Sequence, residues 1–296
     1  MGWPPSGIRR REPLADHTSF RIGGPAEWFA EPSSIEELVE VLRASVRRGT
    51  PVWVLGGGTN TLAADRGLHG LVVHLGAGFR TIQPRSAETP APCMDVACGA
   101  AVLTQRLVRL AATQGWGEVE SLAGLPGQVG GAVAMNAQDI GRFVQRVDLV
   151  SLDGTLRQLT RAQLQFRYRD TALDPGIIAR VLLRFPLISS TEAQQRIQHV
   201  LRYRHTTQET GLPSAGCAFK NPPGIGAGRL IDEAGLKGVR IGDAQVSHRH
   251  ANFIVNLGRA TCDDVLSLME HIQQRVHRRH GVWLEPEVRL LGERCA

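Results

Sequence analysis

The chain has 296 residues, which is enough for two or three domains that each bury a core of their own. Its hydrophobic content of 42% and charged content of 21% are ordinary for a globular protein, and no run of 18 apolar residues could span a membrane. The net charge of +6 favours an anionic partner. Because the cations form no polybasic stripe and aromatics are only 5%, a phosphorylated metabolite is a better candidate than nucleic acid.

The numbers and positions of cysteine and lysine give further information on metal sites, cellular compartment and candidate site residues. The five cysteines are Cys93, Cys98, Cys217, Cys262 and Cys295. They form no CxxC pair and no cluster with metal spacing, so we expect reduced thiols and no metal site. The N-terminal stretch lacks the apolar core of a signal peptide, which favours the cytoplasm. Only Lys220 and Lys237 are lysines among 34 basic residues, so an ammonium at position 220 is notable in a chain that otherwise uses arginine.

The first part of the chain alternates between helix and strand. Residues 32–51 predict a helix with an apolar face, Ser33 as its N-cap and Glu36 as the partner in a capping box. Two buried strands with a glycine turn between them are then expected at 52–55 and 71–75.

The middle of the chain is rich in strands, and the last third mixes short strands with helices. The strands expected from apolar runs span 93–99, 146–154, 177–185 and 252–257. The helices expected from the periodicity span 101–115, 191–208, 228–236 and 261–281. The helix at 191–208 is interpreted as a connector. The last helix carries acids in its first turn and cations in its last, which matches the helix dipole.

A first glycine loop, 55-LGGGTN-60, follows an apolar strand. Glycines let backbone N–H groups turn toward an anion and let a phosphate approach closely. The loop is not GxGxxG and no helix is expected after it, so a Rossmann fold is not indicated. Taken alone, a plain glycine turn explains it equally well.

A second glycine loop is 124-GLPGQVGGAVAMN-136. Its glycines, Gly130 and Gly131 included, are expected to expose backbone amides, while Pro126 stiffens the turn. The apolar residues 132–135 suit a helix start or a wall for a ring system. Two such loops together could clamp a pyrophosphate.

Three further residues have both a chemical and a structural interpretation. Cys217, in SAGCAFKNP, could be a buried filler or a proton donor beside a charged substrate. Arg169 could form a surface ion pair with Asp170, and Glu287 could be exposed beside Arg289. The residues themselves leave these alternatives open.

Several motifs, taken together, point to one family. They are 18-TSFRIGGPAEWF-29, LGGGTN, GLPGQVGGAVAMN, 166-FRYRD-170, SAGCAFKNP, 242-GDAQVSHRHANFIVN-256 and 284-LEPEVRLLG-292. In this order, and over nearly the whole chain, the set resembles the UDP-N-acetylenolpyruvoylglucosamine reductase (MurB) family. LGGGTN alone is shared with many FAD-linked oxidases.

The resemblance implies an enzyme with noncovalent FAD that takes hydride from NADPH. Its substrate is an enolpyruvyl UDP-sugar, and its product is UDP-N-acetylmuramic acid, a cell-wall precursor. The motifs place the FAD site at Gly56, Gly57, Gly58, Thr59, Asn60, Gly124, Pro126, Gly127, Val129, Gly130 and Ala132.

The resemblance also implies three catalytic residues and a group that holds the substrate. Arg169 and Glu287 would stabilise the enolate formed by hydride transfer, and Cys217 would protonate its α-carbon. The substrate-binding candidates are Lys220, Asn221, Tyr203 and Arg204.

The chain departs from the family pattern in two places. The family usually has serine where Cys217 stands, although a thiol can also protonate carbon. Relatives often continue the second loop with asparagine, a small residue, glycine and an aromatic, whereas this chain reads 136-NAQDIGRF-143. The short spacing between FRYRD and AGCAF assigns the chain to the branch that lacks an inserted tyrosine segment, so a more open site is expected.

The expected fold is α+β, with a two-part FAD-binding domain of the type found in this family and in FAD-linked oxidases, and a smaller α+β substrate domain. The expected parts are 1–75, 76–200 and 201–296, with the last strand, at about 282–296, supplying the catalytic glutamate. A monomer without nucleic-acid or membrane partners is expected. The alternatives are another FAD-linked oxidoreductase on the same scaffold, and a nucleotide-sugar binding protein without turnover.

Overall fold

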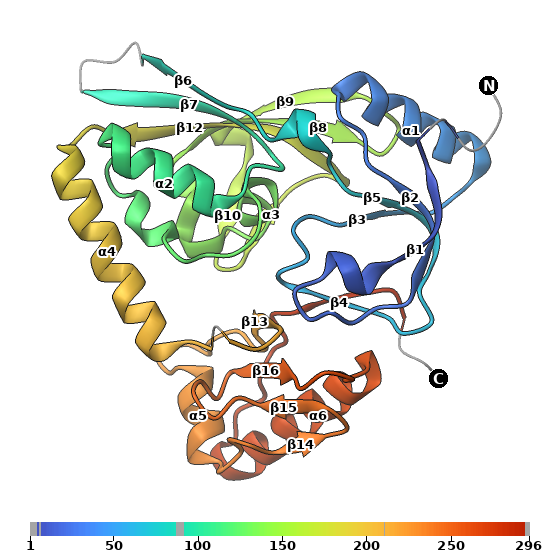
Figure 1. The fold of residues 1–296 in the computed structure, drawn as a ribbon, viewed down its shortest axis with the longest axis vertical. Coiled ribbons are helices and arrows are strands. Elements are labelled where there is room, and N and C mark those ends of the chain that lie inside the picture. The colour runs from blue at the N-terminus through green and yellow to red at the C-terminus, as the bar shows by residue number, and fades with distance from the viewer. Residues whose placement is uncertain (1–4, 6, 87–91, 210, 294–296) are drawn as a thin grey trace. The chain divides into compact units, whose positions relative to one another are not determined.

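The computed structural model describes residues 5, 7–86, 92–209 and 211–293 and mixes helices with strands, which confirms the α+β class (Figure 1). Residues 1–4 and 6 of the N-terminal stretch, and Cys295, lie outside the described residues.

The chain divides into two compact units, and each is built from three segments. Unit 1 comprises Met1–Arg9, Trp28–Gly57 and Gly70–Arg204. Unit 2 comprises Arg10–Glu27, Gly58–His69 and His205–Ala296. The division into parts at 1–75, 76–200 and 201–296 stays a prediction.

Unit 1 contains a five-stranded antiparallel sheet with the order β6-β7-β12-β8-β9. Its strands are β6 (Ile82–Ser86), β7 (Cys93–Gly99), β8 (Val144–Ser151), β9 (Leu156–Thr160) and β12 (Gly176–Pro186). The central strand β12 pairs with β7 on one side and β8 on the other, with Val181 opposite both Cys98 and Val147. These strands confirm the predicted strands at 93–99, 146–154 and 177–185 to within a few residues.

Four helices belong wholly or mainly to unit 1: α1 (Ile35–Arg48), α2 (Thr104–Gln114), α3 (Val129–Ala134) and α4 (Ser190–Thr207). Helix α3 packs against β7 and β12, on the side of the sheet where α2 also lies (Figure 1). The hydrophobic core of this unit includes Trp116, which stacks on Phe185 at 5.9 Å between ring centroids.

The predicted cap of α1 is wrong by one residue. Ser34, and not Ser33, is the N-cap, and its hydroxyl accepts a hydrogen bond from the Glu37 amide. Ser33 instead donates its backbone N–H to the Glu37 carboxylate at 2.7 Å. With adjacent serines followed by adjacent glutamates, the sequence fits both registers. The helix ends at Arg48, and its C-cap Gly49 has the left-handed conformation that glycine adopts readily.

Unit 2 contains a four-stranded sheet with the order β13-β16-β15-β14. Its strands are β13 (Ser214–Cys217), β14 (Arg240–Ile241), β15 (Ala244–Val246) and β16 (Phe253–Asn256), and its helices are α5 (Ala227–Glu233) and α6 (Cys262–His280). Helix α6 packs on β14 and β15 and on α5. Phe20, Ile22 and Leu62 join the same core, so the two N-terminal segments are integral to this unit.

The remaining strands are short. A four-stranded sheet has the order β1-β2-β5-β3, formed by β1 (Arg9–Pro13), β2 (Pro25–Ala30), β5 (Leu68–Val73) and β3 (Val52–Val54). Two further pairs are β4 (Thr61–Ala63) with β17 (Arg289–Leu291), and β10 (Gln165–Arg167) with β11 (Asp170–Ala172). No helix follows the first glycine loop, as predicted, but β4 does.

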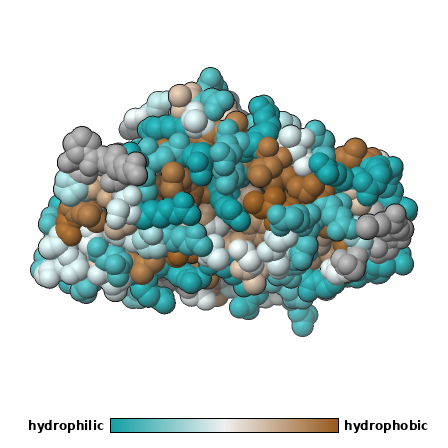
Figure 2. Space-filling view, turned by 90° about the horizontal axis from the view of Figure 1, so that it is seen from above, coloured by the Kyte–Doolittle hydropathy of each residue, from teal (hydrophilic) through white to brown (hydrophobic). Residues whose placement is uncertain are grey.

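Short 3₁₀ helices connect these elements. They are η1 (Leu14–His17), η2 (Ala77–Phe79), η3 (Val119–Leu122), η4 (Ala137–Arg142) and η5 (Arg161–Gln163). Among the described residues, no helix is both long and apolar enough to cross a bilayer. The face seen in Figure 2 shows hydrophobic groups separated by hydrophilic ones.

Candidate functional site

The two glycine loops lie against each other within unit 1. A Cβ built on Gly57 would come within 3.0 Å of the Gly127 Cα and 3.5 Å of the Gln128 side chain. The loops are therefore packed closely at position 57, and a side chain there would require the Gly127 backbone to shift by a few tenths of an ångström. This contact supports the prediction that the loops work as a pair.

At two glycines of these loops, the space beside the backbone is not filled by other atoms of the chain. A Cβ on Gly131 would meet nothing within 4 Å, and one on Gly56 would meet only the Gln128 Oε1 at 3.7 Å. Packing within the chain therefore requires glycine at neither position. Bare backbone that a ring or a pyrophosphate can approach fits the binding of a dinucleotide such as FAD.

Gly130 does not expose its amide, so that part of the prediction is wrong. Its N–H donates to the Ala100 carbonyl at 2.8 Å, and the Val129 N–H donates to the Val102 carbonyl at 2.8 Å. A Cβ on Gly130 would lie 2.8 Å from the Ala100 Cβ. Glycine is required here because α3 crosses the neighbouring chain closely.

The rest of the first loop belongs to unit 2. Gly58 has φ +63°, and a Cβ there would collide with the His17 carbonyl, so only glycine fits. Asn60 donates from Nδ2 to the Glu287 carbonyl at 3.0 Å, and its own carbonyl accepts from the Arg289 N–H at 3.0 Å. The loop is thereby joined to the chain around Glu287.

The segments that carry Cys217 and Glu287 run antiparallel to each other. The Glu287 N–H donates to the Ala218 carbonyl at 2.8 Å, and the Lys220 N–H donates to the Glu285 carbonyl at 2.9 Å. The side chains of Cys217 and Glu287 are each half-buried, so the interpretation of Cys217 as a fully buried filler is wrong. Unit 2 therefore joins AGCAFKNP, LEPEVR and Asn60 through the backbone.

Asn252, which is not among the predicted site residues, holds this arrangement. It is 2% exposed; its Nδ2 donates to the Phe219 carbonyl at 2.8 Å and its Oδ1 accepts from the Phe219 N–H at 3.0 Å. The Ala218 N–H donates to the Asn252 carbonyl at 2.7 Å. An asparagine directly before the apolar run of β16 was the available signal, because a buried amide needs partners.

The substrate candidates in unit 2 have partners within the chain. The Lys220 ammonium pairs with the Glu285 carboxylate at 2.5 Å, in an ion pair whose glutamate is 70% exposed. The Asn221 Oδ1 accepts from the Ala227 N–H at 2.9 Å and so satisfies the first amide of α5.

Arg169 lies in unit 1, at the turn of the hairpin formed by β10 and β11. Its backbone has φ +56°, which is uncommon for a residue with a side chain. Its guanidinium carbon is 5.3 Å from the centre of the Tyr168 ring, within the range of a cation–π contact.

The candidates on α4 also belong to unit 1. Tyr203 is 66% exposed, and Arg204 lies beside the second glycine loop. The Arg204 Nη2 donates to the Ser121 carbonyl at 3.3 Å, and its Cδ would be 2.8 Å from a Cβ on Gly124.

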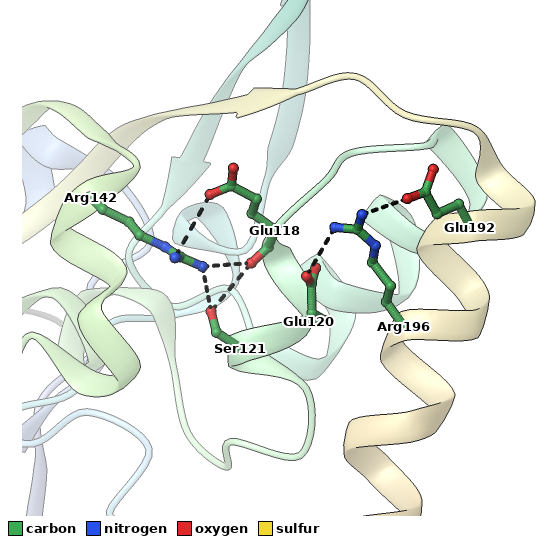
Figure 3. Close-up of polar contacts among 6 residues, drawn as sticks. All are labelled: Glu118, Glu120, Ser121, Arg142, Glu192 and Arg196. Atoms are coloured by element: carbon green, nitrogen blue, oxygen red, sulfur yellow. Dashed lines mark hydrogen bonds and ion pairs between the residues drawn. The ribbon is translucent and has the colours of Figure 1, made fainter.

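Helix α4 is tied to the chain that precedes the second loop by charged side chains (Figure 3). Arg196 pairs with Glu192 at 2.5 Å and with Glu120 at 3.5 Å. Arg142 donates to the Glu118 carbonyl at 2.9 Å and to the Ser121 hydroxyl at 3.3 Å. The residues of Figure 3 thus connect α4 and η4 to η3.

The departure from the family pattern at 136–143 falls on left-handed backbone. Asn136, Gln138 and Asp139 have φ of +42°, +51° and +57°. The family's glycine would adopt this conformation at position 138 without cost, whereas glutamine adopts it against a preference of about 1–2 kcal/mol.

Burial shifts the pKa of two groups and makes one thiol inert. Desolvation raises the pKa of the Cys98 thiol to about 12, so this cysteine is not a nucleophile at neutral pH. Desolvation also lowers the pKa of His250, and the positive charge of Lys237 lowers it further. Within the part of the chain that the structure describes, no three His, Cys, Asp or Glu side chains are placed to hold a metal ion.

Comparisons with known proteins match nearly the whole length of the chain. Residues 26–160 match the family model described as FAD binding domain, and residues 207–291 match the UDP-N-acetylenolpyruvoylglucosamine reductase, C-terminal domain. A reductase of this name from Geobacter metallireducens is 42% identical, and the alignment covers 97% of this chain and 94% of the relative.

Two further relatives agree. UDP-N-acetylenolpyruvoylglucosamine reductase 2 from Symbiobacterium thermophilum is 40% identical over 97% of this chain and 93% of its own. The crystal structure of the reductase (MurB) from Thermus caldophilus is 38% identical, covers 96% of this chain and 100% of its own, and superposes with a TM-score of 0.80. The chain therefore belongs to the UDP-N-acetylenolpyruvoylglucosamine reductase family.

Proposed function

We infer that this protein reduces UDP-N-acetylglucosamine enolpyruvate to UDP-N-acetylmuramate, with FAD as its noncovalent cofactor and NADPH as the hydride donor. Family membership supports this activity. The observation that carries it is the backbone pairing in unit 2, which brings together AGCAFKNP, LEPEVR and Asn60 of the first glycine loop.

FAD, when bound, supplies a hydride from flavin N5 to the terminal vinyl carbon of the substrate. The residues that would hold FAD are Gly56, Gly57, Gly58, Thr59, Asn60, Gly124, Pro126, Gly127, Val129, Gly130 and Ala132. The open backbone at Gly56 and the contact of Gly57 with Gly127 support this set. The amide of Gly130 is already used, so its contribution is the close packing of α3.

The protein's own residues have two tasks, which are to stabilise a negative charge on the substrate and to deliver one proton to it. Hydride arrival at the vinyl carbon puts negative charge on the α-carbon and its carboxylate. The Arg169 guanidinium and the Glu287 carboxyl group stabilise that charge, and the Cys217 thiol delivers a proton to the α-carbon. The half-buried positions of Cys217 and Glu287 support these roles, because both side chains are partly accessible.

Lys220, Asn221, Tyr203 and Arg204 would hold the substrate, with Lys220 on its diphosphate or its carboxylate. The Lys220 ammonium pairs with the largely exposed Glu285. An anionic substrate would compete with Glu285 for the ammonium, and little energy opposes the exchange because exposed ion pairs are weak.

We further propose that the protein acts as a monomer in the cytoplasm and that its three functional parts span 1–75, 76–200 and 201–296. The free thiols of Cys93 and Cys98 support a reducing compartment.

The test is to purify the protein and record its visible spectrum and its oxidation of NADPH with and without the enolpyruvyl UDP-sugar. A flavin spectrum and substrate-dependent NADPH oxidation are expected. A yellow protein that oxidises NADPH regardless of this sugar would favour another flavin oxidoreductase. A colourless protein that binds the sugar without turnover would favour a binding protein.

A further inference from the structure

The turn that carries Arg169 belongs to a very short hairpin. Strands β10 and β11 pair over three residues each, with Arg167 opposite Asp170, and only Tyr168 and Arg169 lie between them. Arg169 also has left-handed backbone, with φ +56°. A two-stranded hairpin of this length is marginally stable alone, so its position depends on what holds it from outside.

Two side-chain hydrogen bonds, one partly and one fully buried, fasten this hairpin to α3 and the chain after it. The Asn136 Nδ2 donates to the Arg167 carbonyl at 2.9 Å. On the other strand, the Thr171 hydroxyl donates to the Val133 carbonyl at 2.6 Å. The two bonds reach both strands of the hairpin from the C-terminal end of the second glycine loop.

The Asn136 side chain uses both of its ends. While Nδ2 holds the Arg167 carbonyl, Oδ1 accepts from the Gly141 N–H at 2.9 Å. Asn136 is only 8% exposed and has φ +42°, a conformation that asparagine tolerates better than most residues. A donor and an acceptor on one short side chain are both needed here, so neither aspartate nor serine is equivalent.

We propose that Asn136 is a positioning residue that sets the place of Arg169 by holding the Arg167 carbonyl two residues before it. Stabilisation of a developing charge depends steeply on where the guanidinium lies, so a small shift of the turn slows the reaction. The proposal rests on the proposed function, because it assumes that Arg169 stabilises the enolate. It adds that the second glycine loop, besides its role toward the cofactor, fixes a catalytic side chain.

The sharpest variant is Asn136→Asp, which keeps the acceptor for the Gly141 N–H and loses the donor to the Arg167 carbonyl and to the Asp139 carboxylate, which lies at 3.5 Å. Rapid mixing separates flavin reduction by NADPH from flavin reoxidation by the enolpyruvyl UDP-sugar. We expect reoxidation to slow by about tenfold or more while reduction by NADPH changes less than about twofold. In an Arg169→Ala background the same substitution should cost less than about twofold, because the residue through which it acts is gone.

The matched control is Asn256→Asp in unit 2. Asn256 is 3% exposed, donates to the Phe20 carbonyl at 2.9 Å and accepts from the Gly258 N–H at 2.7 Å and the Ala260 N–H at 3.0 Å, so aspartate there likewise loses a donor and keeps an acceptor. Its effect on reoxidation, whatever its size, should be equal in the wild-type and Arg169→Ala backgrounds.

Wild-type reoxidation in Asn136→Asp, or an equal loss in both backgrounds, would overturn the proposal. If the aspartate variant fails to fold, Asn136→Ser loses the hydrogen bond to Arg167 with a smaller side chain. Its test is the same: the fold-change in the reoxidation rate, measured in the wild-type and in the Arg169→Ala background. Thr171→Val removes the other tie, and it should also slow reoxidation less in the Arg169→Ala background. A wild-type protein that the sugar does not reoxidise at all would instead refute the proposed function.

Discussion

Cys217 stands at the end of β13, where it lies opposite Phe253 of the neighbouring strand β16. The next residue, Ala218, accepts a hydrogen bond from the Glu287 N–H, so the chain around Cys217 is fixed on two sides. Gly216, with φ +75°, leaves the approach to this point without a side chain. The thiol is therefore held in place and partly accessible, as a proton donor must be.

We predict that Cys217→Ser retains substantial activity and that Cys217→Ala loses most of it, because hydroxyl and thiol can donate a proton and a methyl group cannot. Steady-state turnover of the enolpyruvyl UDP-sugar measures the difference. Flavin reduction by NADPH serves as the control, since it precedes the protonation and should be normal in both variants. An alanine variant that turns over at the wild-type rate would show that another group delivers the proton.

At the scale of residues, the sequence predicted which residues belong to the site better than it predicted their hydrogen-bond partners. The motif around Cys217 and the motif around Glu287 are recognisable locally, but the hydrogen bonds that join them link positions about 70 residues apart. Gly130 was expected to offer an amide, and it is instead used where α3 crosses Ala100. A glycine that serves an anion and one that serves close packing look the same in a sequence.

The segment Gly58–His69 is held to helix α6 by a capping contact within unit 2. Asp65 accepts from the Cys262 N–H at 2.8 Å and from the Asp263 N–H at 3.3 Å. Thr261 caps the next amide, that of Asp264, within the helix's own capping box. Two separate parts of the chain thus accept hydrogen bonds from the N–H groups in the first turn of α6. One of these parts, the segment with Asp65, follows the first glycine loop.

We predict that Asp65→Ala lowers the free energy of unfolding by about 1–2 kcal/mol, because two helix-terminal amides lose a charged acceptor. Asp65→Asn keeps one acceptor oxygen and should cost about half as much. Urea denaturation at neutral pH measures both changes. Asp16→Ala, an exposed aspartate of the same unit, is the control and should change stability by less than about 0.5 kcal/mol. An Asp65→Ala variant as stable as this control would contradict the capping role.

At the scale of elements, long periodic segments were predictable and short paired ones were not. Helix α6 was predicted at 261–281, and it spans Cys262–His280 between the cap Thr261 and Gly281. Strand β4 was missed, because its three residues gain their partner only from β17 at the other end of the chain. The hairpin of β10 and β11 is similarly short, and its own strands carry no clear alternation of apolar and polar residues.

The whole molecule consists of two units with separate apolar cores. Each unit takes segments from widely separated parts of the chain, so no cut at one position would yield both units intact. A sequence shows elements in order and contains no local signal that residues 10–27 and 58–69 pack with the C-terminal segment. The grouping follows from the burial of Phe20 and Leu62 among C-terminal residues, which is a tertiary effect.

Stability of the folded protein should fall on acidification, in part through His250. Burial holds the pKa of His250 below its ordinary value of 6.5, so its neutral form is favoured in the folded state. As the pH falls through 6.5 toward the folded pKa, the unfolded chain binds a proton that the folded chain refuses. The contribution of His250 to stability is therefore present above pH 6.5 and is lost below it.

We predict that His250→Asn removes this component. The Asn252 N–H donates to the His250 Nδ1 at 3.2 Å, and an asparagine oxygen can accept in its place without titrating. Free energies of unfolding at pH 7.5 and pH 5 should show a smaller loss in the variant than in the wild type. An equal or larger loss in the variant would show that His250 does not sense the pH.

The pairing of β4 with β17 also sets an order of events during synthesis. Ala63 lies opposite Leu291, so β4 leaves the ribosome more than two hundred residues before its partner strand exists. At translation rates of about 5–20 residues per second, Phe20 and Leu62 wait roughly 10–55 s for the core that buries them. A nascent chain halted before β17 therefore holds the first glycine loop without the strand that pairs with β4 directly after it.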